Sequence, residues 1–563
     1  MNLAILHGYL LEGSGSNLWT RCVVEALCRK GHTVQLVCQE PHPERYDCIA
    51  EAYRYHLDGT IETMLSRETS ATYPGRCIMH KPQLGDTLPV YVWDKYEEYR
   101  NAVPMVDLPD AEILLYIQRN VGVVLDVVRR HGVAAMHANH AVLMSVVAQR
   151  VSEETGVPYA VMPHGSALEY AVKKDDRFLR LATDAFSAAG RIFVHGEEMR
   201  HRVESILPDV HDAAGKFSVL PLGVHTWQFE PVPRERRREK IGKLLVSLSG
   251  RPRGRRPEQL TTMLARAHAA TNPVEMRAAF TSIQYDTKAP DADIEDKLSQ
   301  LDWEHDAVLL YVGRLISAKG LQSGLAALPE LMASDPGIRL LVVGHGPLRE
   351  PMELFLWGLE HGDRHLVDEV VANGRLLEGD PEGATTAREL GKVRAYFDDL
   401  EAAGRLDDYF RLAKQHVRRD RVIFTGYLTH HELQHLFPCC DVGIFPSIVK
   451  EAGPLVFLEA LASGCFPLGT YFAGMKASID GIADLLPEDV SAMMKLEPFN
   501  TTADIVTNVA QAMYVGVRYK DVLSRTAQNR FDWVSVADKL ARELEALSQA
   551  RHEWSDGPVA IGA

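Results

Sequence analysis

Two glutamates eight positions apart, Glu451 and Glu459, carry the strongest chemical signal in the chain. The first lies in an expected loop and the second inside an expected helix, with Gly453 and Pro454 between them. A glycine allows close backbone approach, and a proline suits the first helical turn, where its missing N–H costs nothing. The free amides and the positive end of such a helix bind anions. The string therefore predicts an anion site, suited to phosphate, beside two carboxylates that accept hydrogen bonds.

A second string places two cations, Arg314 and Lys319, between an expected strand at 308–313 and an expected helix at 320–333. An arginine can bind a diphosphate through two parallel N–H bonds, and a lysine adds a point charge. Both charges would also stabilise the negative charge that builds on a departing phosphate. For this string taken alone, the alternative is a pair of solvated loop cations.

Together the two strings resemble the retaining GT-B glycosyltransferases of glycosyltransferase family 4, which combine an E-x7-E element, a G-R-x4-K-G element and a double-Rossmann fold. The resemblance covers residues 1–225 and 305–550. It implies that Arg314 and Lys319, after Gly313, hold the diphosphate of a nucleotide sugar. It also implies that Glu459 binds ribose and that Glu451 contacts the transferred sugar. The backbone expected around both groups belongs to Gly453, Pro454, Leu455 and Val456.

Three further strings fit the same resemblance. Gly344 and Gly346 lie in what looks like the family's G-x-G-P-L turn, and Tyr427 and Leu428 lie in what looks like its base-binding loop. Phe531-Asp532-Trp533 looks like the start of its terminal helix, which returns to the N-terminal domain.

His164 is the catalytic candidate of the N-terminal half. It follows an expected strand at 158–162, and the family carries a histidine at this place, in the cleft against the donor sugar. The alternative is a structural histidine, an ambiguity that His164 shares with His137 and His140.

The loop after the first expected strand holds Gly13 and Gly15, whose backbone amides are candidates to meet a phosphate or the acceptor. Leu18 occupies the position of the third glycine in a dinucleotide fingerprint, which weakens an NAD-binding interpretation.

No metal site is expected. Asp291-Ala292-Asp293 has the form of an Asp-x-Asp metal motif but sits in a polar segment without a preceding strand. His430, His431 and His435 are close in sequence, but one helix makes a poor metal site, and a capping box at 429–432 explains the region. Arg314, Lys319 and the helix amides already supply positive charge, so no cofactor is expected, and the nucleotide sugar is a co-substrate.

These residues need strands and helices that alternate, and the sequence supplies two such series. The first runs from 3–10 through a helix at 18–29 to short strands at 191–194 and 217–222; the second starts near 307. Alternation of this kind predicts parallel sheets covered by helices, with ligands at the carboxyl ends of the strands. We therefore expect an α/β fold of the GT-B type, with two Rossmann-like doubly wound domains that face a cleft and carry helical insertions.

The expected domains are an acceptor domain at 1–225, an Arg-rich and mostly helical insertion or linker at 226–304, and a donor domain at 305–520. The donor domain contains a helical insertion at about 347–420, and a helix at 521–550 returns to the first domain. Arginines at 234–256 are the candidate contact with an anionic membrane or a polyanionic acceptor, the alternative being a solvated insertion.

The composition of the chain excludes several classes of function. A formal net charge of -15 argues against a dedicated nucleic-acid binder. The eight cysteines include no Cys-x-x-Cys pair and are expected to be small buried side chains. The first residues lack a basic signal-peptide region and no apolar run is long enough to span a bilayer, so a cytoplasmic location is expected.

The sequence thus predicts a retaining, metal-independent glycosyltransferase that moves a hexose from a nucleotide diphosphate sugar, with UDP-sugars favoured by the resemblance. The acceptor is a hydroxyl of a small molecule, glycan or lipid, and oligomers are compatible with the chain. The alternatives are a GT-B nucleotide-sugar epimerase, a phosphorylase-like enzyme, and a non-catalytic nucleotide-sugar sensor or scaffold.

Overall fold

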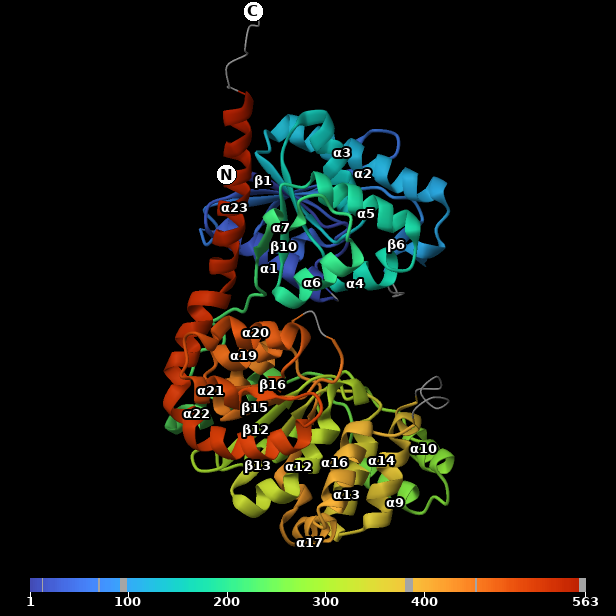
Figure 1. Ribbon diagram of the computed structural model, residues 1–563, viewed down its shortest axis with the longest axis vertical. Helices are drawn as coiled ribbons and strands as arrows, with labels where there is room; N and C mark the ends of the chain where they lie inside the picture. The colour runs from blue at the N-terminus through green and yellow to red at the C-terminus, as the bar shows by residue number, and fades with distance from the viewer. Residues whose placement is uncertain (13, 69–70, 92–98, 380–387, 451–452, 556–563) are drawn as a thin grey trace, which may run out of the picture. The chain divides into compact units, whose positions relative to one another are not determined.

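The computed structural model describes residues 1–12, 14–68, 71–91, 99–379, 388–450 and 453–555 (Figure 1). The chain divides into two compact units, which are Met1–Gly223 with Arg530–Ala563 (unit 1) and Val224–Asn529 (unit 2). Each unit is built on its own sheet, so the predicted α/β class with two Rossmann-like domains is confirmed.

Unit 1 contains a nine-stranded sheet in the order β11-β10-β9-β8-β1-β2-β5-β3-β4. Neighbouring strands are parallel, except that the edge strand β4 runs antiparallel to β3. The sheet strands are β1 (Asn2–Leu6), β2 (Thr33–Val37), β3 (Ile49–Tyr55), β4 (Ile61–Ser66), β5 (Arg76–Pro82), β8 (Ala135–Asn139), β9 (Tyr159–Met162), β10 (Arg191–Val194) and β11 (Phe217–Val219). A separate two-stranded sheet pairs β6 (Thr87–Val90) with β7 (Asn101–Pro104).

Helices cover both faces of this sheet. The helices of unit 1 are α1 (Gly15–Arg29), α2 (Asp110–His131), α3 (Met144–Thr155), α4 (Gly165–Ala167), α5 (Asp176–Ala188), α6 (Glu197–Ile206), α7 (Ala213–Lys216) and α23 (Trp533–Ser555). Side chains alternate along a strand, and Ala4 and Leu6 of β1 belong to the core that α2, α3 and α5 complete. On the other face α1 packs against α23 (Figure 1).

The first strand is shorter than predicted. A strand was expected at 3–10, but β1 ends at Leu6. Gly8 adopts the left-handed conformation (φ 76°), which turns the chain away from the sheet two residues later. This turn places His7 at the carboxyl end of the sheet.

Unit 2 contains a six-stranded parallel sheet in the order β14-β13-β12-β15-β16-β17. Counted within the unit this is 3-2-1-4-5-6, the Rossmann order, in which the chain reverses direction across the sheet between the first and fourth strands. That switch point lies between β12 and β15, where Leu309 pairs with Val442. The strands are β12 (Ala307–Val312), β13 (Ile338–Val343), β14 (Val422–Gly426), β15 (Val442–Phe445), β16 (Phe466–Thr470) and β17 (Lys495–Leu496).

The helices of unit 2 include those that the strand pattern requires and those of two insertions. The sheet helices are α12 (Leu321–Ser334), α18 (His430–Leu436), α19 (Leu455–Ala462), α20 (Ala473–Ala483), α21 (Glu488–Met493) and α22 (Thr501–Phe531). The inserted helices are α8 (Arg237–Leu248), α9 (Pro257–His268), α10 (Pro273–Thr281), α11 (Ile294–Ser299), α13 (Arg349–His361), α14 (Arg364–Glu378), α16 (Gly391–Ala402) and α17 (Leu406–His416).

The segment at 226–304, expected as an insertion or linker, packs within unit 2. The Arg237 guanidinium is 2% exposed and contacts the equally buried Asp441 carboxylate at 2.5 Å. Arg234 reaches the same carboxylate at 2.9 Å. Asp441 precedes β15 and also accepts a hydrogen bond from the Val308 N–H of β12 (3.0 Å). The insertion therefore anchors the two strands that flank the switch point.

The terminal helix α23 belongs to unit 1. It begins at Trp533, whose ring packs so closely on Gly223 that a Cβ there would lie 2.3 Å from it. Glu543 accepts hydrogen bonds from Arg191 and Ser218, at the edge of the sheet. Among the described residues, none of the helices combines the length and the apolar composition that crossing a bilayer requires.

Candidate functional site

The loops that follow β12 and β15 are bound to each other at the switch point of unit 2. The Ile448 N–H donates to the Ala318 carbonyl (2.9 Å), and the Ser447 hydroxyl donates to the same oxygen (3.3 Å). Gly320 is left-handed (φ 77°), and a Cβ there would lie 1.9 Å from the Pro446 carbonyl oxygen. Only glycine fits this close approach, so Gly320 allows the two loops to meet.

The loop after β13 lies against the loop after β12 for a similar reason. A Cβ on Gly344 would lie 1.9 Å from the Gly313 carbonyl oxygen, and one on Gly346 would lie 2.3 Å from that of Leu315. The Leu315 N–H donates to the His345 carbonyl (2.8 Å). Gly344 and Gly346, predicted to bind a donor, thus have a direct role in packing one loop on another.

Arg314 and Lys319 lie at the two ends of the loop after β12. The Tyr311 hydroxyl is 3.3 Å from the carbonyl oxygens of both residues, which ties the loop to the end of its own strand. Arg314 is exposed and forms no ion pair with any residue that the structure describes. Burial and the nearby Arg314 charge lower the pKa of His345. Arg314 therefore presents at the carboxyl edge of the sheet a positive charge that none of the described carboxylates pairs with.

A carboxylate from the inserted helices supports this loop. Both oxygens of Glu378, at the end of α14, lie 3.2 Å from the Ser317 N–H. The contact stabilises the short helical turn Ser317–Lys319. Sequence reasoning missed it, because Glu378 lies in a charged segment whose partners the sequence does not indicate.

Helix α19 follows the loop that meets the loop of Arg314 and Lys319, and Pro454 is its N-cap residue. The first-turn amides of a helix have no partner within the helix, so those of Leu455 and Val456 are available to an anion. Glu459, one turn further, is 5% exposed. One of its oxygens lies 2.5 Å from Nδ1 of His430, and the other is buried with no hydrogen-bond partner among the described residues. Glu451 lies outside the described residues.

The loop after β14 completes this edge of the sheet. Tyr427 is half-buried, and its ring meets the His345 ring edge to face at 5.2 Å between centroids. Leu428 is 4% exposed. The predicted capping box follows, with reciprocal bonds between Thr429 and Glu432 that fix the start of α18. The half-buried Tyr427 ring therefore lies against the loop after β13.

The structure thus brings the predicted residues of unit 2 that it describes, which exclude Glu451, to one edge of one sheet. They lie in loops that follow four strands, β12, β13, β14 and β15, with the cations, the helix start and Glu459 nearest the switch point. Ligands of Rossmann-like sheets bind at this place. Chemically the edge offers positive charge, free amides and a carboxylate acceptor.

His164 of unit 1 lies in a cluster of buried imidazoles at the carboxyl ends of β1, β8, β9 and β10. Its ring centroid is 4.8 Å from that of His140 and 5.8 Å from that of His195. His164 Nε2 and His137 Nε2 lie 3.2 Å and 3.1 Å from the Asn139 side-chain oxygen. Sequence reasoning missed Asn139, although a polar residue that ends a buried strand was a signal for it.

These imidazoles are neutral. Burial lowers the pKa of His164 well below its usual value, and the neighbouring His140 and His195 add to the effect. Burial also lowers the pKa of His7 and of His137 to about 4. A neutral imidazole donates one hydrogen bond and accepts another, so His164 is suited to bind a hydroxyl rather than an anion.

In the glycine loop of unit 1, Ser14 and Gly15 are exposed. Ser14 caps α1 through its side chain, which accepts from the Asn17 N–H (3.3 Å), and Gly15 begins the helix with open space around it. Gly13 lies outside the described residues. Access to a phosphate or an acceptor is therefore open at Gly15, and the predicted contact itself stays a prediction.

The Arg-rich segment contributes to the interior of unit 2. Arg255 is 2% exposed and pairs with Glu353 (2.5 Å) and Glu350 (3.3 Å). Asp291 is 1% exposed and is held by Arg349 (2.5 Å) and Lys297 (2.6 Å). The hypothesis that this arginine run is simply solvated is therefore wrong for Arg255, as it is for Arg237.

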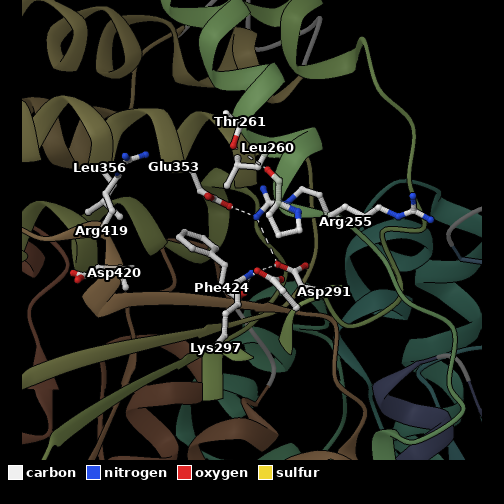
Figure 2. Close-up of a pocket in the computed structure, with 14 residues that line it drawn as sticks. Arg255, Leu260, Thr261, Asp291, Lys297, Glu353, Leu356, Arg419, Asp420 and Phe424 are labelled. Carbon is white, nitrogen blue, oxygen red and sulfur yellow. Dashed lines mark hydrogen bonds and ion pairs between the residues drawn. The ribbon is translucent and has the colours of Figure 1, made fainter. Parts of the chain in front are cut away.

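Several of these charges line a pocket of about 270 Å³ beside β14 (Figure 2). Figure 2 shows the Arg255 side chain directed at Glu353 and Asp291, with Lys297 on the other side of Asp291. Burial alone would raise the pKa of Asp291, but Arg349 and the other cations lower it. Arg255, Lys297, Asp291 and Glu353 pair with one another across the pocket, so these four side chains form a structural ion cluster.

Asp291 therefore has a structural role, and its carboxylate already binds cations of the protein. Within the described part of the chain, no group of three or more His, Cys, Asp or Glu side chains is placed to hold a metal ion. All eight cysteines are free and buried, as predicted.

Comparison with known proteins supports the interpretation of unit 2. Residues 401–480 match the family described as Glycosyl transferases group 1, over a stretch that includes β14, β15 and Glu459. With two Rossmann-like domains and this match in the second, the predicted GT-B fold class is confirmed.

Glycogen synthases from two strains of Mycobacterium tuberculosis, CDC 1551 / Oshkosh and ATCC 25618 / H37Rv, are 25% identical to the chain over 250 residues. The match spans 44% of this chain and 44% of each relative, less than half of the length of either.

Solved structures resemble the chain over nearly its whole length at low identity. Sucrose-phosphate synthase from Thermosynechococcus elongatus is 16% identical, with a TM-score of 0.47 over 98% of this chain and 99% of that one. HepE from Anabaena in complex with UDP is 13% identical, with a TM-score of 0.49 over 97% of this chain and 100% of that one.

Proposed function

We propose that the chain is a glycosyltransferase that binds a nucleotide diphosphate sugar at the carboxyl edge of the unit 2 sheet. The observation that carries the proposal is the meeting of the Arg314 and Lys319 loop with the loop that leads into α19, at the switch point. The match of residues 401–480 to glycosyl transferases group 1 supports it from the same unit.

In this proposal Arg314 and Lys319 hold the diphosphate together with the first amides of α19. Two cations and a helix start neutralise most of a diphosphate's charge, so the site does not need a metal ion. The same groups stabilise the charge that develops as the nucleotide departs, and this effect lowers the barrier as well as the dissociation constant. Tyr427 and Leu428 contact the base, for which uracil is the expected choice.

We propose that transfer proceeds with retention. The bond between the anomeric carbon and the phosphate oxygen breaks, and the acceptor hydroxyl forms its bond on the same face. The departing phosphate oxygen takes the acceptor proton, so no nucleophile of the protein is required. For Glu451 and His164 we propose the roles that the resemblance implies, which are to orient the sugar and to hydrogen-bond it; the neutral His164 imidazole suits the second role.

The direct test combines ligand binding with two variants. Thermal unfolding is measured with UDP, GDP and ADP and with their glucose or mannose conjugates, because a ligand that binds only the folded state raises the melting temperature. Arg314→Ala and Lys319→Ala should each lower turnover more than about a hundredfold, since each removes a partner of the leaving group. Lys243→Ala, an exposed cation of α8 paired with Glu239, is the matched control and should leave turnover unchanged.

Each alternative gives a different result in the same assays. An epimerase converts its nucleotide sugar without an acceptor, and a phosphorylase-like enzyme needs inorganic phosphate. A sensor or scaffold binds the donor without releasing nucleoside diphosphate. Near-normal turnover in Arg314→Ala or Lys319→Ala, with Lys243→Ala for comparison, would contradict the proposed site.

A further inference from the structure

The two oxygens of Glu459 have different surroundings. Oε1 lies 2.5 Å from Nδ1 of His430, whereas Oε2 is buried and has no hydrogen-bond partner among the described residues. A carboxylate only accepts hydrogen bonds, so Nδ1 of His430 is the donor. A buried polar atom without a partner is costly, and such atoms in folded proteins call for a reason. A bound ligand that donates a hydrogen bond to Oε2 would remove the cost.

His430 is placed to hold Glu459 from a neighbouring element. It is the first residue of α18, whose start is fixed by the reciprocal bonds between Thr429 and Glu432. Glu432 is fully buried and pairs with Arg251 of the insertion, so the backbone at His430 is anchored in the interior. The His430 side chain itself is 54% exposed. The His430 ring can therefore be replaced without damage to the core.

The hydrogen bond between His430 and Glu459 joins the end of the loop after β14 to helix α19. Tyr427 and Leu428 precede His430 by three and two residues, and Glu459 lies one turn inside α19. A group that lies between an aromatic base contact and a diphosphate site faces the sugar of a nucleotide. The hydroxyls of ribose are hydrogen-bond donors of the kind that Oε2 lacks.

We propose that His430 is a positioning residue that orients Glu459, so that the free carboxylate oxygen selects ribonucleoside over deoxyribonucleoside diphosphates. This proposal rests on the proposed function. His430 makes no contact with the ligand through Nδ1; it fixes the rotamer of Glu459 and leaves Oε2 directed at the ribose. Without the imidazole, the carboxylate is free to turn towards solvent and the selection is lost.

The test measures dissociation constants by titration calorimetry for whichever of UDP, GDP and ADP binds best, and for its 2′-deoxy and 3′-deoxy counterparts. A hydrogen bond to a charged acceptor corresponds to a preference of about 10- to 100-fold for the ribonucleotide in the unaltered protein. In His430→Ala the preference should fall below about threefold, while the affinity for the deoxynucleotide stays the same. His430→Asn, whose side-chain amide can take the place of Nδ1, should restore much of the preference.

The neighbouring histidine of the same helix provides a matched control. His431 is exposed, and its ring pairs with His435 and Gln434 rather than with Glu459. His431→Ala should keep the full preference. Glu459→Gln should lose it with a normal melting temperature, since the amide is close in size to the carboxylate.

The outcomes separate this inference from the function on which it rests. An unchanged ribose preference in His430→Ala, with the nucleotide still bound, would overturn the role of His430 and leave the proposed function intact. Equal loss of affinity for the ribonucleotide and the deoxynucleotide would show that His430 supports the whole site, which also overturns the inference. If the unaltered protein binds none of the three nucleoside diphosphates, the proposed function fails and the inference fails with it.

Discussion

Replacement of Gly320 by alanine tests how far the chemistry depends on the meeting of two loops. Gly320 has a φ of 77°, and the added Cβ would lie 1.9 Å from the carbonyl oxygen of Pro446 and 2.8 Å from its carbon. Both atoms belong to the backbone of the loop after β15, so a change of side-chain rotamer cannot relieve the overlap. The two loops must separate by roughly 1 Å before the nearest contact reaches 3.0 Å.

The cost has two parts. A left-handed conformation costs about 1–2 kcal/mol for a residue with a Cβ. Overpacking against backbone adds about 1–3 kcal/mol. We therefore expect Gly320→Ala to destabilise unit 2 by about 2–5 kcal/mol. The separation also moves Lys319 relative to the start of α19, and a displacement of about 1 Å in a catalytic arrangement lowers turnover by about a hundredfold.

Thermal unfolding followed by calorimetry measures the first effect, and donor turnover per folded molecule measures the second. Gly242→Ala is the control: Gly242 lies within α8 with open space around it, so alanine should stabilise the helix by up to about 1 kcal/mol and leave turnover unchanged. A Gly320→Ala protein with normal stability and normal turnover would refute the argument that the two loops form one site. Reduced stability with normal turnover would show that their contact serves the fold alone.

Two further predictions concern buried charge. Asp441→Ala leaves Arg237 buried at 2% exposure without its partner, so unit 2 should lose about 3–5 kcal/mol in denaturant unfolding. Arg236→Ala breaks an exposed pair with Glu239 and should leave the free energy of unfolding nearly unchanged. Equal effects of the two changes would contradict the role of burial. Burial lowers the pKa of His7, His137 and His195 from 6.5 to about 4, so the unfolded chain binds protons that folded unit 1 does not. Stability should therefore be full above pH 6.5 and fall as the pH drops towards 4, by about 1.4 kcal/mol per pH unit for each histidine. A melting temperature of unit 1 that is constant from about pH 7 to about pH 5 would contradict this.

The strands around the site could be predicted because they are buried on both faces. Runs such as Ile338–Val343 and Ala307–Val312 are almost continuously apolar, which is typical of parallel strands covered by helices. The glycines and charged residues after them mark the ends of the strands, where Rossmann-like sheets bind ligands. In unit 2 the same apolar runs therefore predict both the strands and the place where the site lies.

The order of the strands in the unit 1 sheet could not be predicted from the sequence pattern. Strand β5 pairs with both β2 and β3, so it lies between two strands that precede it in the chain. The edge strand β4 is largely exposed and lacks a buried face. Register of this kind depends on contacts distant in sequence, which hydrophobic periodicity does not encode.

The ion-pair partners of the arginines could not be predicted either, because they are also distant in sequence. Arg237 and Asp441 are separated by 204 positions, and no spacing rule connects them. In the sequence, a run of arginines in a polar segment is typical of a solvated surface, and only the folded chain shows which of them are buried. In the sequence His430 is one of three close histidines and no spacing distinguishes it, because its partner Glu459 comes from another helix.

The insertion at 226–304 is part of the support of the proposed nucleotide site. Its segment next to Asp291 pairs with the end of β14: the Asp291 N–H donates to the Thr425 carbonyl (2.9 Å), and the Tyr427 N–H donates to the Ala289 carbonyl (3.1 Å). Gly426 is left-handed, and a Cβ there would lie 2.7 Å from the Ala289 oxygen, so the close approach requires glycine. Since the neutralised Asp291 carboxylate fixes this segment in the interior, the ion cluster determines where the loop with Tyr427 begins. The Arg-rich segment that the sequence suggests for a membrane surface thus contributes charges that help to position the loop of the proposed base contact.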